Sequence, residues 1–200
     1  MVRAPSFCGV ILAAGESSRM GRDKALLPWR HTTFLVGAIE LLSPLTDMVI
    51  VVAGRNADNL QALVDAAGAS LVVNPEPQRG QFSSLRVGMQ EVLNQGRDAA
   101  IVALVDRPPA RSETVRLLKT AFVRSAEQVW AVVPEFSGRH GHPLVIGREL
   151  IEAFLRAPLN ATARQIEHQH QQHIEYVSVE DPLVVLNVDT PEDYQRITSG

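Results

Sequence analysis

Short apolar runs alternate with longer amphipathic segments along the first two thirds of the chain. The runs are rich in β-branched residues and apolar on both faces, which is typical of strands buried in a parallel sheet. They fall at residues 7–13, 47–53, 70–73, 99–105 and 129–133. The amphipathic segments between them predict helices at about 33–43, 57–67, 83–95 and 112–125. This alternation predicts a three-layer α/β/α sandwich around a Rossmann-like, mainly parallel sheet.

The last third of the chain has a less regular pattern. It predicts strands near 143–146, 174–179 and 184–188, and helices near 148–156 and 162–170. A final helix is expected at "TPED", with Thr190 as N-cap, Pro191 at the first helical position and Asp193 reaching back. Asn56 and Ser112 are the expected N-caps of two earlier helices. No repeat or linker interrupts the pattern, so we expect a single domain over residues 1–200.

Composition and charge narrow the class of protein. A formal net charge of −3 argues against a general nucleic-acid binder, which would usually be basic. Cys8 is the one cysteine, which excludes a disulfide framework and fits a reducing compartment. No apolar run approaches the length of a membrane span, and the N-terminal run is followed at once by charges, unlike a signal peptide. We therefore expect a cytoplasmic protein without nucleic-acid or membrane partners.

The stretch "LAAGESSRMGRDK" at 12–24 follows the first predicted strand, where open α/β sheets bind their ligands. It contains no G-x-G, so the dinucleotide fingerprint is absent and an NAD-linked oxidoreductase is disfavoured. Five residues separate Gly15 from Gly21, and Arg22 follows, whereas a P-loop needs four residues and then Lys and Ser or Thr. Both common phosphate motifs therefore fail on spacing.

What remains is a loop with small residues early and cations late. Ala13, Ala14 and Gly15 allow a ligand to approach the backbone closely. Arg19 and Lys24 can place positive charge on phosphate oxygens. The residues alone do not separate such a phosphate cradle from a solvated loop that merely connects two elements.

Five spaced blocks give the chain a resemblance to a known family. They are "LAAGESSRMGRDKALLPW" at 12–29, "NPEPQRGQFSSLRVG" at 74–88, "VDRP" at 105–108, "GHP" at 141–143 and "NVDTPED" at 187–193. In this order the blocks resemble the MobA-like NTP transferases, which have the nucleotide-diphospho-sugar transferase fold. Within that family the chain looks most like the molybdenum-cofactor branch, in particular the molybdopterin cytidylyltransferases. The blocks are specific for the family and less specific for the acceptor.

The resemblance implies a nucleotide site made of two segments. The first would cradle the triphosphate, and the second would contact the base and ribose. From the residues alone, Ser83 and Ser84 are better explained as ordinary capping residues of a helix start, and only the resemblance favours nucleotide binding. The nucleotide-binding residues carried over are Leu12, Ala13, Ala14, Gly15, Arg19, Lys24, Asn74, Gly80, Ser83 and Ser84.

The resemblance also implies a metal site and catalytic residues. Asp106 ends an apolar run, and its carboxylate suits Mg²⁺ that bridges phosphates, although a turn aspartate before Pro108 would look the same. Asp189 would share the Mg²⁺, although a helix-entry aspartate is also common. Arg19, Lys24 and Asp106 are the implied catalytic residues. The family usually has glycine and Gln or Met on either side of the aspartate, where this chain has Val105 and Arg107.

Histidines cluster at two places. In "GRHGHP" at 138–143 the glycines indicate a tight turn, and the resemblance places His142 near the acceptor, with Arg164 as a second acceptor-binding residue. Neither histidine of this turn has the partners that a zinc site needs. The second cluster, "EHQHQQH" at 167–173, is better explained as a solvated polar helix face.

Together these observations predict transfer of CMP from CTP to a phosphorylated acceptor, molybdopterin or the molybdenum cofactor, with release of pyrophosphate. Ala14 and "SSL" resemble the cytidylyl rather than the guanylyl branch. A molybdoenzyme would be a partner, and the chain a monomer or weak homodimer. Two alternatives stay open: transfer to a sugar phosphate or methylerythritol phosphate, and a non-catalytic nucleotide-binding accessory protein, which Val105 and Arg107 motivate.

Overall fold

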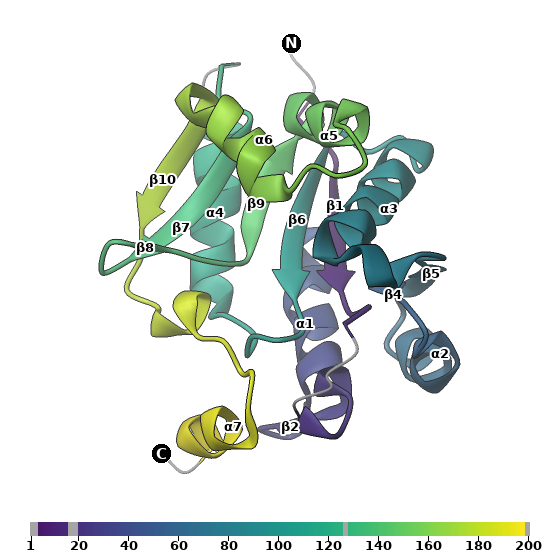
Figure 1. The fold of residues 1–200 in the computed structure, drawn as a ribbon. Coiled ribbons are helices and arrows are strands. Elements are labelled where there is room, and N and C mark those ends of the chain that lie inside the picture. Colours follow the sequence, from purple (N-terminus) through teal and green to yellow (C-terminus); the bar gives the residue numbers. More distant parts are fainter. Residues whose placement is uncertain (1–3, 16–19, 126–127, 199–200) are drawn as a thin grey trace.

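The core of the molecule is an eight-stranded sheet (Figure 1). The structure is a computed structural model and describes residues 4–15, 20–125 and 128–198. The strand order is β10-β7-β9-β6-β1-β4-β5, with β8 paired to β7. These strands are β1 Phe7–Leu12, β4 Met48–Ala53, β5 Ser70–Val73, β6 Ala99–Leu104, β7 Ala131–Phe136, β8 Arg139–His140, β9 Leu144–Gly147 and β10 Ile174–Ser178. The expected strands are confirmed except at 184–188, and the one expected at 129–133 begins two residues later.

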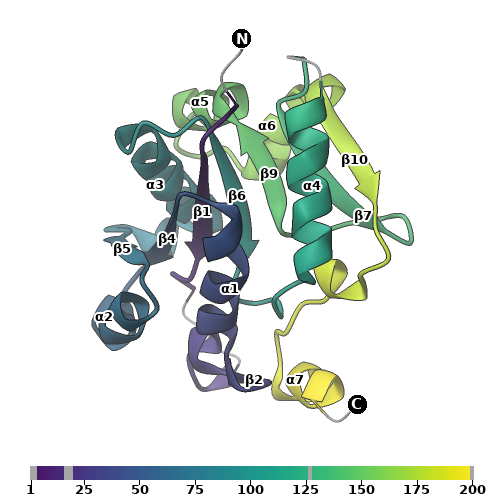
Figure 2. The same cartoon turned by 180° about the vertical axis from the view of Figure 1, so that it is seen from behind.

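Helices cover both faces of the sheet, which confirms the three-layer sandwich. Helices α1, α2 and α4 bury their apolar residues with one set of sheet side chains, including Phe7 and Ile11, and are in front in Figure 2. Helices α3, α5 and α6 pack on the other face, against Cys8 and Val10. Helix α7 lies apart, beside the hairpin of strands β2 Pro28–Trp29 and β3 Thr32–Thr33. The helices are α1 Phe34–Leu42, α2 Ala57–Ala66, α3 Gln81–Asn94, α4 Ser112–Arg124, α5 Arg148–Arg156, α6 Ala163–Gln169 and α7 Pro191–Thr198.

Strand direction decides where a ligand can bind. β1 is parallel to β4 and β6 on its two sides, and β4 is parallel to β5. β9 is antiparallel to both β6 and β7, so the sheet is mainly rather than wholly parallel. The carboxyl ends of β1, β4 and β6 therefore meet at one edge, where open α/β sheets bind their ligands. In Figure 1 this is the lower edge, on the side of β2 and α7.

Short elements fill the connections. The hairpin β2 Pro28–Trp29 and β3 Thr32–Thr33 was not expected from the sequence. Short 3-10 helices also lie in the described part of the chain, at η2 Lys24–Leu26, η3 Ser43–Leu45, η4 Pro77–Arg79, η5 Gln171–His173 and η6 Pro182–Val185. No helix in the described ranges is both long and apolar enough to cross a membrane.

The prediction of a strand at 184–188 is wrong. Residues Pro182–Val185 form the single turn η6, because Pro182 starts it and the Asp181 carboxylate accepts a hydrogen bond from the Leu183 backbone N–H at 3.1 Å. Val184 and Val185 are buried against Phe136 and Val177, so their β-branched character reflects packing rather than strand pairing. After η6 the chain runs toward Asp106, which matters for the site below.

Two local expectations also change. Helix α4 is preceded by Arg111 as its N-cap, so Ser112 is the first helical residue rather than the cap. The Asp181 carboxylate accepts hydrogen bonds from the Arg111 N–H and the Thr114 hydroxyl, which supplies the anchoring that a serine cap would have given. In the "EHQHQQH" segment, the His173 ring stacks on Trp130 at 4.1 Å between centroids, so this part is not a purely solvated face.

Close packing of α3 on the sheet depends on Gly88. A Cβ at this position would lie 2.7 Å from Val10 Cγ1 and 3.1 Å from Val52 Cγ2. Because both neighbours belong to buried central strands, we expect Gly88→Ala to lower the free energy of unfolding by about 1–3 kcal/mol. Chemical denaturation measures this, and Gln90→Ala, on the exposed face of the same helix, should change it by less than about 0.5 kcal/mol. Equal values for both variants would contradict the packing argument.

Candidate functional site

Three charged side chains from distant parts of the chain meet at the carboxyl edge of the sheet. Lys24 Nζ and Asp189 Oδ1 form an ion pair at 2.7 Å, with exposed side-chain fractions of 13% and 39%. The Asp106 carboxyl lies within electrostatic reach of both, because each shifts its pKa. Burial dominates and raises the pKa of Asp106, whereas Arg107 and Lys24 lower it. The structure thus brings Lys24, Asp106 and Asp189 together, as the resemblance implied.

Lys24 is held in place by two neighbours. The Asp23 carboxylate accepts a hydrogen bond from the Ala25 N–H at 3.0 Å and so caps η2, which begins with Lys24. The Asn56 amide donates to the other Asp23 oxygen at 2.6 Å and to the Ala13 carbonyl at 2.9 Å. Asn56 stands at the N-cap position of α2 without making the expected side-chain cap. Instead, its side chain ties the two ends of the opening loop together.

The opening loop passes close to the end of β4. Ala13 is buried and its N–H donates to the Val52 carbonyl at 2.8 Å, which continues the ladder beyond β1. A Cβ on Gly54 would meet the Ala14 carbonyl and Pro77 at 3.0 Å each, so only glycine lets these segments approach. Gly15 is exposed, and a Cβ there would have no atom within 4 Å. Arg19 lies outside the described residues.

Hydrogen bonds on both sides of Asp189 fix the backbone that carries it to the site. The Val188 N–H donates to the Asp106 carbonyl at 2.7 Å, which joins the segment after η6 to the end of β6. The Asp193 carboxylate accepts hydrogen bonds from the Asp189 and Thr190 N–H groups, and the Thr190 hydroxyl accepts from the Asp193 N–H. The predicted capping arrangement at "TPED" is therefore present, and it also orients Asp189.

The predicted base-binding residues form one hydrogen-bonded group. Asn74 is only 3% exposed, and its amide donates to Ser83 Oγ at 2.8 Å and to Ser84 Oγ at 3.0 Å. Its carbonyl oxygen accepts from the Glu76 N–H at 2.9 Å. These bonds fasten the end of β5 to the first turn of α3. Gly80 precedes that turn with φ +91°, and a Cβ there would have open space around it.

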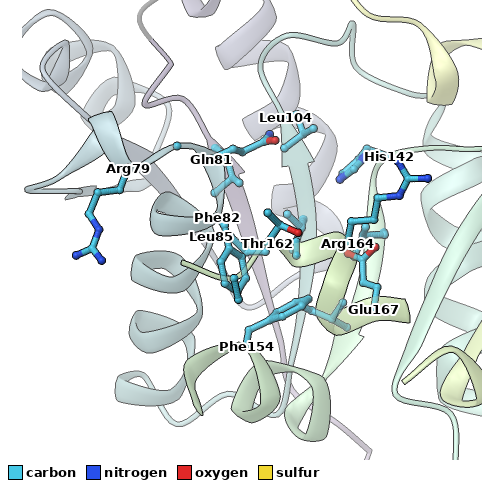
Figure 3. A pocket seen from close by; sticks show the side chains of 17 residues that line it. Arg79, Gln81, Phe82, Leu85, Leu104, His142, Phe154, Thr162, Arg164 and Glu167 are labelled. Atoms are coloured by element: carbon cyan, nitrogen blue, oxygen red, sulfur yellow. The ribbon is translucent and has the colours of Figure 1, made fainter. Parts of the chain in front are cut away.

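A cavity of about 440 Å³ opens between α3, α5, α6 and strands β6 and β9 (Figure 3). Its walls are mainly apolar, and Phe82 and Phe154 meet edge to face with centroids 5.6 Å apart. Leu12, Gly80, His142 and Arg164 all line it, so the two predicted acceptor-binding residues face one space with part of the predicted nucleotide site. Glu167, which the sequence did not single out, lines the cavity, and burial raises its pKa.

Burial of the His142 ring lowers its pKa to about 3, and the positive charge of Arg107 is the second cause. The ring Nδ1 is buried and has no hydrogen-bond partner among the described residues. The same is true of Asp106 Oδ1 and Arg107 Nε. Three unsatisfied polar atoms therefore belong to three residues around the end of β6, a concentration typical of a site that awaits a ligand.

The sequence profile of the MobA-like NTP transferase domain matches residues 9–175 of the chain. The chain belongs to the MobA-like NTP transferase family. This confirms the predicted family and the prediction of a nucleotidyltransferase. Among the relatives of this MobA-like chain, the molybdenum cofactor cytidylyltransferase of Escherichia coli (strain K12) is 24% identical over 92% of each chain. The protein named nicotine blue oxidoreductase from Paenarthrobacter nicotinovorans is 32% identical over 96% of this chain and 97% of its own length.

A solved structure is similar over the whole MobA-like chain. Rv0371c from Mycobacterium tuberculosis H37Rv superposes with a TM-score of 0.84 at 27% identity, and covers 100% of both chains. A second structure of that protein, in complex with manganese, has a TM-score of 0.78 at 25% identity and covers 98% of this chain and 99% of its own. These similarities confirm the predicted fold class, and the second structure shows that fold in complex with manganese.

Proposed function

We propose that this MobA-like protein transfers CMP from CTP to a phosphorylated acceptor of the molybdopterin type and releases pyrophosphate, with Mg²⁺ as cofactor. The observation that carries the proposal is the meeting of Lys24, Asp106 and Asp189 beside the opening loop. It supplies a cation for phosphate oxygens and two carboxylates for a divalent metal ion at one sheet edge. Val105 and Arg107 leave this arrangement intact, which favours an enzyme over a non-catalytic accessory protein.

The residues present fit a divalent cation. The Asp106 carboxyl has a buried oxygen without a partner in the described part of the chain. Burial raises its pKa more than Arg107 and Lys24 lower it, so a further cation would stabilise the ionised form. No group of three or more His, Cys, Asp or Glu among the described residues could hold a metal ion. A site with two carboxylates suits Mg²⁺, which keeps water and phosphate oxygens as its other ligands. When bound by Asp106 and Asp189, the ion would neutralise charge on the phosphates.

The protein's own part in the reaction is positioning and charge. Backbone from Leu12 to Gly15 would bind the triphosphate, and Lys24 would offset charge on the α-phosphate and the departing pyrophosphate. An oxygen of the acceptor phosphate attacks the α-phosphorus, the new P–O bond forms, and the bond to pyrophosphate breaks. Because that oxygen is already ionised at neutral pH, no general base is needed. Arg19 would add a second cation to the triphosphate side.

The choice of CTP and of the acceptor rests on different support. Ala14 and the serines after Gly80 resemble cytidylyltransferases, and a relative of that name is 24% identical. Proteins named as probable molybdenum cofactor guanylyltransferases are similarly related, with one from Bacillus mycoides at 23% identity. The relative named as an oxidoreductase makes a redox activity the contrasting possibility. The absence of a G-x-G-x-x-G sequence speaks against a nicotinamide cofactor.

A pyrophosphate-release screen tests the proposal. The full chain is incubated with Mg²⁺, each of the four NTPs, and molybdopterin, glucose 1-phosphate or methylerythritol phosphate. We expect release at least tenfold above background with CTP and molybdopterin, and loss of release after chelation with EDTA. Release that is stronger with a sugar phosphate would overturn the acceptor, and release that is stronger with GTP would overturn the base. Oxidation of NADH or NADPH with no release from any NTP would replace the proposed function altogether.

A further inference from the structure

A small apolar cluster, here called the satellite cluster, lies outside the two groups of core residues that pack on the sheet. It consists of Met20, Leu27, Phe34 and Val188, with Trp29, Tyr194 and Ile197 packed against it. Met20 and Leu27 stand before and after Lys24 in the sequence. Val188 and Tyr194 stand before and after Asp189. The position of Lys24 relative to Asp189 therefore depends on how the satellite cluster packs.

Helix α7 depends on the satellite cluster for its place in the molecule. It has 8 residues, Pro191–Thr198, and none of these described residues is fully buried. A helix this short is marginal in water by itself, so its packing partners must hold it. In Figures 1 and 2, α7 lies beside the hairpin and away from the sheet. Tyr194 and Ile197 are its residues in the cluster, and they supply the apolar contacts that dock the helix.

Tyr194 adds directed contacts to this packing. Its hydroxyl donates a hydrogen bond to the Pro28 carbonyl at 2.7 Å, which ties α7 to β2. Its ring meets Phe34 edge to face, with 6.2 Å between the ring centroids. The guanidinium carbon of Arg22 lies 5.5 Å from the centre of the same ring, and Arg22 comes shortly before Lys24 in the chain. One side chain thus contacts the hairpin, the start of α1 and the end of the opening loop that carries Lys24.

The backbone transmits the position of Tyr194 to Asp189. The Tyr194 N–H donates to the Thr190 carbonyl at 3.1 Å. The Asp193 carboxylate accepts from the Asp189 N–H at 3.1 Å, so Asp189 is joined to the first turn of α7. On the other side of Asp189, the preceding residue is bonded to the end of β6. Because only one side is fixed by the sheet, a shift of α7 would turn the Asp189 carboxylate away from Asp106.

We propose that Tyr194 is a positioning residue, which docks α7 on the satellite cluster and thereby holds the Asp189 carboxylate where it can bind a divalent cation together with Asp106. This inference rests on the proposed function, because that function assigns the cation to these two carboxylates. Tyr194 acts through Asp189 and supplies no ligand itself. Two carboxylates from distant segments bind one ion well only when their separation is fixed in advance, since ordering them during binding offsets part of the gain.

Binding of Mn²⁺ to the full chain, followed by electron paramagnetic resonance, tests the proposal. Mn²⁺ stands in for Mg²⁺ because its free and bound forms give different signals. We expect Tyr194→Leu to weaken Mn²⁺ binding at least about tenfold, because the two carboxylates are no longer held at one separation. Tyr194→Phe keeps the ring contacts and loses the bond to Pro28, so we expect a loss of about threefold. Asp189→Asn removes the ligand itself and should weaken binding at least as much as Tyr194→Leu.

The Mg²⁺ dependence of pyrophosphate release gives a second readout. Tyr194→Leu should raise the Mg²⁺ concentration for half-maximal rate at least about fivefold, and saturating Mg²⁺ should restore most of the rate. A purely structural role would give a different result, because a smaller folded fraction lowers the rate by the same factor at every Mg²⁺ concentration.

Phe122→Leu is the matched control. Phe122 also makes an edge-to-face contact, with 6.0 Å between its ring centroid and that of Phe7. Phe7 begins β1, so this aromatic pair lies at the edge of the sheet opposite to the site. Loss of an aromatic contact should lower the thermal unfolding midpoint in both leucine variants. The affinity for Mn²⁺ should change by less than about twofold in Phe122→Leu, because sites without shared partners act independently.

The outcomes separate this inference from the proposed function. If Asp189→Asn weakens Mn²⁺ binding and Tyr194→Leu does not, the role of Tyr194 is rejected and the proposed function stands. An equal loss in Phe122→Leu, or a rate that saturating Mg²⁺ does not restore, would also reject that role. If Tyr194→Leu fails to fold, Tyr194→Phe decides, and unchanged affinity there would overturn the proposal. If the wild type binds no Mn²⁺, or Asp189→Asn binds it equally well, the proposed metal site is wrong and this inference falls with it.

Discussion

Asp106→Asn is expected to lower the rate of pyrophosphate release at least about 10³-fold while the protein stays folded. The replacement removes the negative charge that would hold the cation, but it keeps the shape of the side chain. Because burial raises the pKa of Asp106, the ionised carboxylate is unfavourable in the folded state near neutral pH. The variant should therefore have a thermal unfolding midpoint equal to or above that of the wild type. The rate and the midpoint are measured on the same preparation.

Asp181→Asn is the control with the opposite expectation. Asp181 is 1% exposed, and its carboxylate accepts from the Arg111 N–H, the Thr114 hydroxyl and the Leu183 N–H. An asparagine side chain accepts hydrogen bonds through its oxygen only, whereas both oxygens of Asp181 accept. The free energy of unfolding should therefore fall by about 2–4 kcal/mol, while the folded protein keeps its rate of pyrophosphate release. Full activity in Asp106→Asn, or a loss of stability larger than in Asp181→Asn, would remove Asp106 from the proposed metal site.

Lys24→Ala is expected to reduce the catalytic rate about 10²- to 10³-fold, because a cation close to the transferred phosphoryl group stabilises charge that grows in the transition state. Asp189 is 39% exposed and can be solvated after the lysine is removed, so the loss of stability should be small. Steady-state kinetics separate the two contributions. A rate loss at saturating CTP indicates a role in the transition state, whereas a higher KM alone would indicate binding only.

Lys119→Ala provides the matched lysine control. Lys119 Nζ donates to the Leu45 carbonyl at 2.6 Å and lies 4.7 Å from the centre of the Phe7 ring. Phe7 begins β1, so this lysine is at the edge of the sheet opposite to the site. Its replacement should affect stability and leave the rate per folded molecule unchanged. An unchanged rate in Lys24→Ala, or an equal loss in both variants, would contradict a catalytic role for Lys24.

The sequence predicted the parts of the site that are carried by local pattern. Asp106 could be located because it ends a buried strand, and Asp189 because "TPED" is a recognisable helix start. The same reasoning misjudged Val184 and Val185, whose β-branched side chains looked like a strand. A buried parallel strand and a buried single helical turn can both appear in the sequence as a short run of β-branched apolar residues. One sequence does not distinguish the two. The roles of Asn56 and Gly54 were missed because their partners, at Ala13 and Ala14, are distant in sequence.

The sequence by itself determined the fold class and the family, because strand and helix periodicity and spaced motifs are local properties of the chain. It also named the charged residues of the proposed site. Only the tertiary structure decided which charges meet. The ion pair of Lys24 with Asp189 joins residues 165 positions apart, and it depends on the path of the chain after η6. The contact of the Arg107 guanidinium with the Val184 carbonyl was likewise set by packing, because the two residues are 77 positions apart in the sequence.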